Sequence, residues 1–436
     1  MSIEKIQHWI KIILDSKKKI IITLTIFLIL GCDLGFIVVD QLFGEEKGVL
    51  FGIKIPVLIL IADLVIIVTV LLGYILVAII RSFKKILSTY SKFIQELTVS
   101  LVSVILLLFI IELVFYSILK YKNQYKIKTI EVEDKKFLTD DSILGYVARK
   151  NQKTACRKMV YDPSLKDTIS VFNVSYTIDS SGFRVMNIPA MQKRHNYAAF
   201  FGCSLTFGLG VDDDQTIPYY FAQADTSFCS YNFALSGYGP QNTLALLQNN
   251  DLKKIIWQDS GVGIYIYMAD HVARAIGDMR SYNMWVRNFP YYDYKDGRLF
   301  HYGNFSHDRK FVSTAYSLMG KSNFIEFFEI NLPFVTKPSH YRLTCDIIYE
   351  SYLEYKKTFH NDNFYVIIYP SGPNISNTGI IEYLKTYSIK MLDLSNLFNP
   401  EDARYYISKY DHHPTPLANK ILAEYLAKEL KEFANR

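Results

Sequence analysis

The stretch YAAFFGCSLTFG, residues 197–208, decides how the second half of this chain is interpreted. It begins with a short apolar run that ends at Gly202, which is typical of a buried strand. Ser204 follows where the strand must turn into a helix, so its hydroxyl is expected beside free backbone N–H groups at a helix start. Because such N–H groups can hold a developing oxyanion, this serine is a candidate nucleophile.

Short apolar segments and helical segments alternate from this point to the C-terminus. The alternation predicts an α/β fold with a parallel, doubly wound sheet, whose ligands bind beyond the carboxyl ends of the strands. Residues 275–340 interrupt the alternation, and we expect them to form an insertion over the site, with a hairpin around Asp296-Gly297. The predicted strands are 197–202, 227–235, 261–268, 364–369 and 388–394, and predicted helices start at Thr216 and cover 241–250 and 416–433.

One further polar cluster follows the second strand, and another is expected in the C-terminal loop just before the last helix. Gly237 allows a close backbone approach and offers a second oxyanion donor. Asp411-His412-His413-Pro414 offers a base and an acid to orient it, which a serine nucleophile requires. Each residue also has a structural alternative: Ser204 as a helix cap, His413 as a surface histidine, Asp411 as an acid at a helix start, and Gly237 as a turn glycine.

In combination, these blocks resemble those of the SGNH (GDSL-like) hydrolase and acyltransferase superfamily. The first block of that superfamily, Gly-Asp-Ser-Leu-Thr, is similar to Gly202-Cys-Ser204-Leu-Thr, and its late Asp…His block is similar to residues 411–414. The resemblance covers about residues 140–436 and includes two lead-in motifs of membrane-anchored members, at 144–146 and 176–184. It implies a flavodoxin-like, three-layer α/β/α fold, with Ser204 as nucleophile, His413 as base, Asp411 as its orienter, and the N–H groups of Ser204 and Gly237 as the oxyanion hole.

The third block departs from the superfamily pattern. Asp270 occupies the position expected for an Asn that donates to the oxyanion, and an ionised carboxylate cannot donate. Either Asp270 is protonated, or it turns away and binds Arg274, or His271 donates instead. In the late block, the acid and the base are two residues apart rather than three, which leaves His412 as an alternative base.

No metal site and no cofactor is predicted. The run Asp212-Asp-Asp214 resembles a calcium-binding cluster, but a solvated turn before a helix is favoured. Cys203 stands where the superfamily usually has Asp, and a packed, inert thiol is favoured for it. A Cys203–Cys229 disulfide is disfavoured because opposite strand ends separate the two residues by roughly 15–20 Å. A Cys156–Cys345 disulfide stays open for a domain outside the cytoplasm.

Composition separates the first third of the chain from the rest. Half of the 436 residues are hydrophobic and 21% are charged, which excludes intrinsic disorder. The apolar excess lies in three runs, 20–39, 55–80 and 97–119, each long enough to cross a hydrocarbon core of about 30 Å. We therefore predict a membrane domain over 1–119 with three transmembrane helices. Each run holds one acid, Asp33, Asp63 or Glu112. A functional role, a protonated or bonded place inside the bundle, and a place near a membrane boundary all stay open for these acids.

Basic residues in the short loops set the predicted orientation. Residues 1–19 hold five lysines and the 81–96 loop holds four basic residues, whereas the 40–54 loop sets three acids against two lysines. The positive-inside rule then places the N-terminus in the cytoplasm and everything after Leu119 outside it. The resemblance to membrane-anchored bacterial members implies the inner (cytoplasmic) membrane and an extracytoplasmic catalytic domain.

We expect a polar, β-rich connector over 120–197, with a strand at 168–178 and a turn at 179–182, before an SGNH hydrolase-like domain over 198–436.

The main hypothesis is a membrane-anchored serine esterase or O-acyltransferase acting on acylated cell-envelope glycan or lipid through an acyl-Ser204 intermediate. The alternative is a catalytically degenerate protein that binds or assembles components of an envelope complex. The expected partners are the lipid bilayer and an acylated carbohydrate or lipid, and a partner in envelope biosynthesis is left open. A net charge of +6 without a basic run in the second half does not indicate nucleic acid.

Overall fold

The computed structural model describes residues 92–133, 136–372 and 376–434, together with 49–50, 53–54 and 63. The chain divides into two compact units. We call residues 1–126 with 322–329 the apolar unit, and residues 127–321 with 330–436 the α/β unit. The first two expected spans lie outside the described residues, as does Asp33, and Asp63 is described only as a helical residue.

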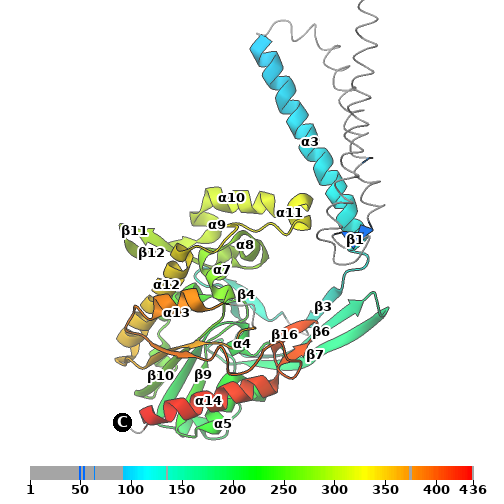
Figure 1. Cartoon of the computed structure of the whole chain (residues 1–436). Helices are drawn as coiled ribbons and strands as arrows, with labels where there is room; N and C mark the ends of the chain where they lie inside the picture. The colour runs from blue at the N-terminus through cyan, green and yellow to red at the C-terminus, as the bar shows by residue number, and fades with distance from the viewer. Residues whose placement is uncertain are drawn as a thin grey trace, which may run out of the picture. The chain divides into compact units, whose positions relative to one another are not determined.

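The α/β unit is built on a five-stranded parallel sheet, which confirms the predicted fold class at that level (Figure 1). The strand order is β14-β13-β10-β8-β9. Numbered along the chain this is 2-1-3-4-5 read from the β9 edge, the flavodoxin-like order, whose switch point lies between the first and third strands. The strands are β8 (Asn196–Phe201), β9 (Phe228–Asn232), β10 (Ser260–Tyr267), β13 (Phe364–Ile368) and β14 (Lys390–Asp393).

Helices cover both faces of this sheet. The apolar cluster on one face includes side chains of α5 (Ile217–Ala224) and α14 (Pro416–Ala434). The cluster on the other face includes α6 (Pro240–Asn249) and α12 (Pro338–Phe359). The predicted helix start at Thr216 is confirmed, because the Thr216 hydroxyl accepts a hydrogen bond from the amide of Tyr219 at 3.2 Å. The helices α7 (Asp270–Ile276) and α13 (Thr378–Leu384) follow β10 and β13.

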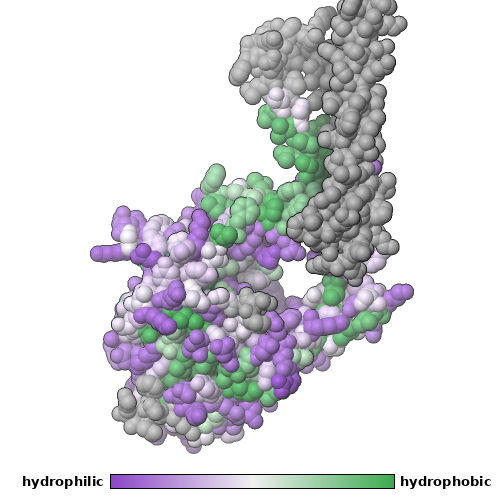
Figure 2. All heavy atoms as spheres, viewed as in Figure 1, coloured by the Kyte–Doolittle hydropathy of each residue, from purple (hydrophilic) through white to green (hydrophobic). Residues whose placement is uncertain are grey.

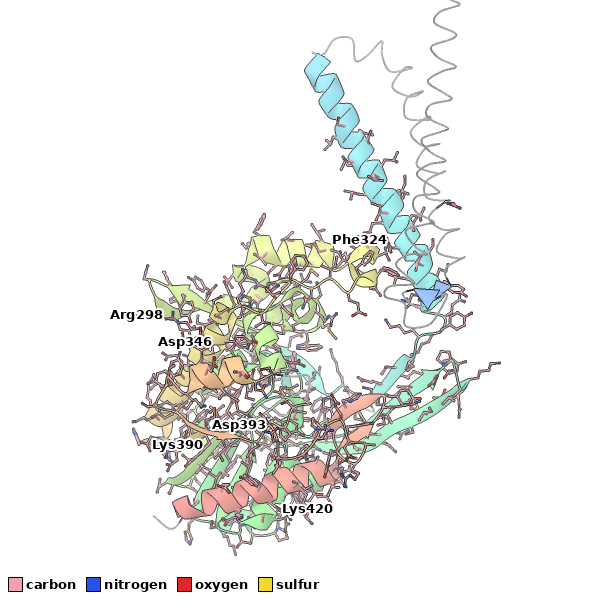
Figure 3. The ribbon with its side chains drawn as sticks, in the orientation of Figure 1. Arg298, Phe324, Asp346, Lys390, Asp393 and Lys420 are labelled. Carbon is pink, nitrogen blue, oxygen red and sulfur yellow. The ribbon has the colours of Figure 1, made fainter. Side chains whose placement is uncertain are left out.

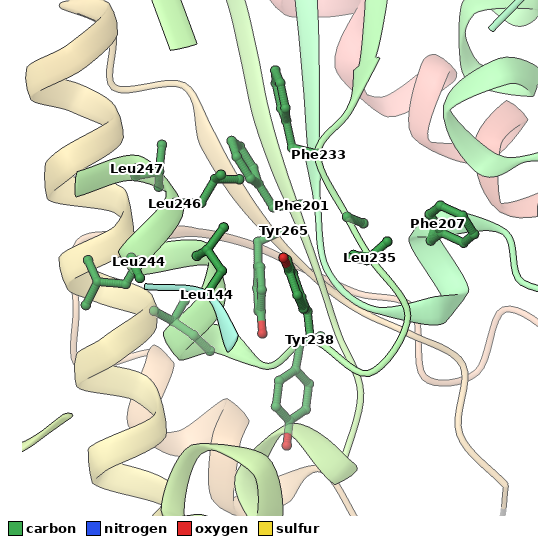
Figure 4. Packing of buried hydrophobic residues seen from close by; sticks show 14 of the residues in the cluster. Leu144, Phe201, Phe207, Phe233, Leu235, Tyr238, Leu244, Leu246, Leu247 and Tyr265 are labelled. Atoms are coloured by element: carbon green, nitrogen blue, oxygen red, sulfur yellow. The ribbon is translucent and has the colours of Figure 1, made fainter. Parts of the chain in front are cut away.

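Strands between residues 128 and 178 pack against the α/β core instead of enclosing a core of their own. Leu144 shares one buried cluster with Phe201, Phe233 and Tyr265, as Figure 4 shows. The predicted strand and turn at 168–182 are present, with the Asp179 carboxylate accepting three backbone N–H groups of the turn. The segment contains a three-stranded antiparallel sheet of β3 (Lys128–Glu133), β6 (Gln152–Asp162) and β7 (Asp167–Ile178), and a hairpin of β4 (Leu138–Asp141) and β5 (Gly145–Ala148).

The region between β10 and α12 holds the irregular part of the α/β unit. The predicted hairpin around Asp296-Gly297 is confirmed by the antiparallel pair β11 (Pro290–Lys295) and β12 (Arg298–Asn304). The helices here are α8 (Met279–Met284), α9 (Phe305–Asp308) and α10 (Lys310–Met319), and the short 3-10 helices of the unit are Met191–Lys193, Asp213–Gln215, Leu252–Lys254 and Val286–Asn288.

The described part of the apolar unit is dominated by α3 (Lys92–Lys122). Within the described residues, one helical segment, Ser100–Lys122, is long and apolar enough to cross a membrane, and it overlaps the third predicted span. The unit also contains α11 (Asn323–Phe327) and a two-stranded pair, β1 (Val49–Leu50) with β2 (Ile53–Lys54).

Candidate active site

Ser204 begins a four-residue helix, α4 (Ser204–Phe207), directly beyond the carboxyl end of β8. The turn between them depends on Gly202, whose φ of +148° lies in the region that favours glycine. A Cβ atom on Gly202 would lie 2.4 Å from the hydroxyl oxygen of Thr206, so a larger residue would displace the helix. Ser204 is therefore held at the switch point of the sheet, the usual ligand-binding edge of this fold.

The late block approaches Ser204 as a strand rather than as the expected loop. Asp411–Pro414 forms β16, which pairs with β15 (Tyr406–Ser408). In a strand, residues two apart share a face and adjacent residues face opposite sides. Asp411 and His413 accordingly lie together, whereas His412 is exposed and its ring stacks on Tyr406 at 4.9 Å between centroids. This alternation explains why the structure brings His413 and not His412 to Ser204.

Three side chains from distant parts of the chain form one hydrogen-bonded row. His413 Nε2 lies 2.9 Å from Ser204 Oγ, and His413 Nδ1 lies 2.6 Å from Asp411 Oδ1. The backbone N–H of His413 also donates to the same carboxylate oxygen, at 2.9 Å. A hydroxyl bonded to an imidazole that is oriented by a buried acid is the arrangement that activates a serine for attack on an acyl group.

Asp411 is kept ionised by its neighbours. Burial alone raises the pKa of this carboxyl group, but the bonds from His413 and Lys158 outweigh it and hold the pKa well below its usual value. Lys158 Nζ lies 2.8 Å from Asp411 Oδ2, and the Asp411 side chain is only 1% exposed. Lys158 lies on β6, and sequence reasoning does not identify it, because a single lysine on a strand forms no motif.

Two backbone amides are available as oxyanion donors. Among the described residues, no hydrogen bond is donated by the amides of Ser204 or Gly237. Ser204 is the first residue of its helix, where the N–H has no intrahelical acceptor. Gly237 follows β9, the neighbour of β8 in the sheet, and has a φ of +83°. A Cβ atom there would lie 2.3 Å from the Tyr146 hydroxyl, so only glycine fits.

The third block provides no side-chain donor to this row. Asp270 turns to solvent, with its side chain 69% exposed and one oxygen 3.9 Å from Arg274. His271 is fully buried, bonds the Tyr265 hydroxyl through Nδ1 at 2.7 Å, and has its pKa lowered well below the usual value by burial and then by Arg274. Of the three alternatives, the structure matches an Asp270 that turns away beside Arg274. No hydrogen bond of the described residues joins Asp270 or His271 to Ser204, His413 or Asp411.

Arg184 braces the loop after the nucleophile from outside the sheet. Its buried guanidinium donates to the carbonyl groups of Phe207, Gly208 and Val211 at 2.6–2.8 Å. It also pairs with Asp213 at 2.9 Å. Asp212 and Asp213 accept backbone N–H groups of β7 as well, so two members of the Asp212–Asp214 run have structural partners.

Tyr146 braces the second block in the same way. Its hydroxyl donates to the carbonyl of Ser236 at 2.7 Å, directly before Gly237. Its own carbonyl accepts the Tyr238 hydroxyl at 2.6 Å. Both lead-in motifs of the sequence resemblance, around Tyr146 and Arg184, thus hold the two loops that carry the candidate oxyanion donors.

The thiols near and around the site are unbridged. Cys203 is buried, with its sulfur 3.4 Å from that of Met268. Cys156, Cys229 and Cys345 are also free and buried, so neither disulfide considered from the sequence is formed.

Comparisons with known proteins find distant structural similarity and no sequence relative. No family model matches the chain, and no curated protein matches it. A protein described as lipolytic and of the G-D-S-L family from Desulfitobacterium hafniense matches with 12% identity and a TM-score of 0.29, covering 53% of this chain and 98% of that one. The acetyl xylan esterase Est2A from Butyrivibrio proteoclasticus matches with 11% identity and a TM-score of 0.36, covering 71% and 88%. The α/β hydrolase LAE5 from the metagenome of Lake Arreo matches with 11% identity and a TM-score of 0.30, covering 54% and 94%. At these identities and TM-scores neither activity nor substrate transfers to this chain.

Proposed function

We propose that this chain is a membrane-anchored serine esterase or O-acyltransferase of the SGNH type, with Ser204, His413 and Asp411 as its catalytic residues. The single observation that supports this most strongly is the contact of His413 Nε2 with Ser204 Oγ at 2.9 Å. The residues are 209 positions apart, and each was singled out from its own sequence block. The imidazole that contacts this strand-end serine is itself bonded to a buried carboxylate. Such an arrangement of three side chains is typical of a catalytic site and has no evident structural purpose.

In the proposed reaction, Ser204 Oγ attacks the acyl carbonyl carbon while His413 Nε2 takes the hydroxyl proton. The carbonyl oxygen becomes an oxyanion, which the amides of Ser204 and Gly237 stabilise. The intermediate then expels the alcohol, which takes the proton from His413, and leaves an acyl-Ser204 ester. Water or an acceptor hydroxyl attacks this ester with His413 as base again, and Ser204 is regenerated.

We further propose that the α/β unit works outside the cytoplasm on acylated glycan or lipid of the cell envelope. The support is the apolar segment Ser100–Lys122 that precedes it and the excess of basic residues in the 1–19 and 81–96 segments. Fusions after Arg436 test the orientation. A reporter active only outside the cytoplasm should work there, and activity of a cytoplasmic reporter alone would reverse the topology.

A degenerate, non-catalytic role is the second candidate, and one observation favours it. Asp270 stands in place of the expected Asn and is exposed, so the third block offers no amide donor. The intact row from Ser204 to Asp411 favours the enzyme, because a binding protein has no need of a buried acid behind an imidazole.

A fluorophosphonate probe separates the two candidates, since it forms a covalent bond with activated serines. We expect the full chain, purified in detergent, to be labelled, and labelling to be lost in Ser204→Ala but kept in Ser236→Ala, the matched control on the neighbouring loop. Tryptophan fluorescence and thermal melting establish that each variant is folded. A folded wild-type chain that stays unlabelled contradicts the enzyme and leaves the binding role.

A further inference from the structure

The helix α11 packs on the apolar helix α3 within the apolar unit. The Glu112 carboxylate of α3 accepts hydrogen bonds from the backbone N–H of Asn323 at 2.7 Å, from its side-chain amide at 3.0 Å, and from the Ser322 hydroxyl. Three phenylalanines surround Phe115 of α3 at centroid distances of 4.8–5.4 Å: Phe324 (labelled in Figure 3), Phe327 and Phe328. The acid of the third predicted span is therefore satisfied by a segment more than 200 residues away.

Glu112 lies inside the third predicted span, and the residues at the C-terminal end of α3 are those typical of a membrane boundary. On the N-terminal side of Glu112, α3 exposes a run of large apolar side chains that includes Leu107, Leu108 and Phe109. On its C-terminal side, it carries two tyrosines and two lysines, at positions 116, 120, 121 and 122. Tyrosine and lysine are typical of the membrane interface, and short helices with polar ends are tolerated there far better than at mid-depth.

The residues flanking α11 in the sequence expose large apolar side chains. Phe311 and Leu318 of α10 are 88% and 65% exposed, and Phe334 and Val335 are 78% and 64% exposed. Leu318 is only four residues before Ser322, and Phe334 is five residues after Glu329. Figure 2 shows the apolar colour gathered over α10. Exposed apolar residues scattered singly need no explanation, but a cluster within 25 residues on both sides of a docked segment does.

Charge in this stretch fits a lipid surface. Lys310, Lys321 and Lys337 are exposed among the exposed apolar positions, and with Glu326 and Glu329 they leave the stretch 310–337 a net charge of 3 − 2 = +1. Interfacial segments combine large apolar side chains with lysines, because the former enter the acyl boundary while the latter stay among phosphate groups. An apolar protein partner would account for the phenylalanines but not for the lysines among them.

We propose that residues 310–337 form a lipid-facing segment that lies in the outer leaflet interface, with Phe311, Leu318, Phe334 and Val335 at the acyl boundary. The segment is a second membrane attachment, added to α3 and continuous with the docked helix α11. This inference rests on α3 crossing the membrane, which is part of the proposed function. The further point is that the chain also contacts lipid through the insertion. The α/β unit would then bind an acylated lipid or a membrane-bound glycan at the membrane surface rather than from bulk solvent.

Spin labels on the full chain in phosphatidylcholine–phosphatidylglycerol vesicles test this proposal. Single cysteines are placed at 311 and 334, at 107 in α3, and at 257, an exposed tryptophan position before β10, in a background whose native cysteines are replaced by alanine. Collision with oxygen, which concentrates in lipid, is compared with collision with a water-soluble nickel chelate. Thermal melting of each spin-labelled chain, compared with that of wild type, establishes that each variant is folded.

We expect positions 107, 311 and 334 to favour oxygen and position 257 to favour nickel. The inference is overturned if 107 favours oxygen while 311 and 334 behave like 257. It is also overturned if 311 and 334 are shielded from both reagents, since a protein partner or a second copy then covers them. If 107 itself favours nickel, the anchoring part of the proposed function fails, and this outcome is distinct from the other two.

Discussion

The five-stranded sheet and the β-rich segment before it contribute to the candidate site in different ways. The three central sheet strands, β13, β10 and β8, are almost wholly buried, and the strand order and turns determine where Ser204 lies. The strands from 128 to 178 are half exposed, yet they supply the polar groups that hold the site: Arg184 follows β7, Lys158 lies on β6 and Tyr146 lies on β5. The comparison teaches that the sheet positions Ser204, whereas the preceding segment restrains Asp411 and the two loops beside the serine.

The largest expected effect concerns His413, the base in contact with the serine that the sheet positions. Replacing His413→Gln removes the base bonded to Ser204, and we expect the rate of fluorophosphonate labelling to fall by about 10⁴-fold or more. The matched control is His412→Gln, because His412 faces away and stacks on Tyr406. Its labelling rate should stay within about twofold of wild type, since surface changes away from a site have small effects. Equal losses in both variants would show that His412 also serves as a base.

Local patterns in the sequence were sufficient for the sheet. Alternation of apolar and helical segments predicted the parallel strands, and Thr216 with Pro218 predicted the start of α5. The blocks around Ser204 and His413 named side chains that the structure brings into contact. The choice between His412 and His413 could not be made, because the block was expected to be a loop and the alternation of a strand decides it.

Contacts over long chain separations could not be predicted. Lys158 meets Asp411 across 253 positions, and Glu112 meets Asn323 across 211. Neither lysine nor glutamate stands in a motif, so only the folded arrangement selects them from the chain's many charged residues. Asp270 could be predicted in part. Its departure from the superfamily pattern is visible in the sequence, whereas the exposure of its carboxylate beside Arg274 is visible only in the structure.

The next largest effect concerns Arg184, in the restraining segment. Arg184→Met removes the guanidinium that donates to three loop carbonyls and to the Asp213 carboxylate, which keeps its bond from the Thr177 N–H, and we expect the free energy of unfolding to fall by roughly 3–5 kcal/mol. A urea titration of the full chain in detergent, followed by tryptophan fluorescence, measures it. Arg157→Met is the control, because Arg157 is exposed on β6 and should change the free energy by less than about 0.5 kcal/mol. Similar losses of unfolding free energy in both variants would show that Arg184 does not stabilise the loop after Ser204.

Lys158 should have a smaller and pH-dependent effect. Lys158→Met removes a bond to the buried Asp411 carboxylate, which His413 still holds, and we expect a loss of about 1–3 kcal/mol at neutral pH. Because the folded pKa of Asp411 is depressed, its contribution is present above the unfolded pKa of about 3.9 and is lost as the pH falls through the folded value. The difference between wild type and variant should therefore stay constant down to about pH 4 and shrink only as the pH falls further, toward the folded pKa values of Asp411.

The control for this pH dependence is Lys153→Met, an exposed lysine on the same strand. Unfolding free energies of the three chains are compared from about pH 2 to about pH 7, so that the range reaches below the usual pKa of an aspartate. If Lys158→Met lowers the free energy of unfolding by the same amount at every pH, packing of the lysine stem explains the loss. The ion pair with Asp411 would then not contribute to stability.

The smallest effect is expected for Tyr146, whose hydroxyl on β5 bonds the loop that follows β9. Tyr146→Phe keeps the ring and removes the bond to the Ser236 carbonyl, so the loop before Gly237 loses one restraint. One hydrogen bond contributes a net free energy of about 1 kcal/mol. If the Gly237 amide stabilises the oxyanion, losing this bond should slow labelling by roughly fivefold. Tyr302→Phe removes an exposed tyrosine bond in the insertion and should leave the rate unchanged. If Tyr146→Phe lowers the free energy of unfolding while labelling proceeds at the wild-type rate, Tyr146 restrains the fold but Gly237 is not an oxyanion donor. A parallel fall in both quantities is the result that ties this restraint to the chemistry.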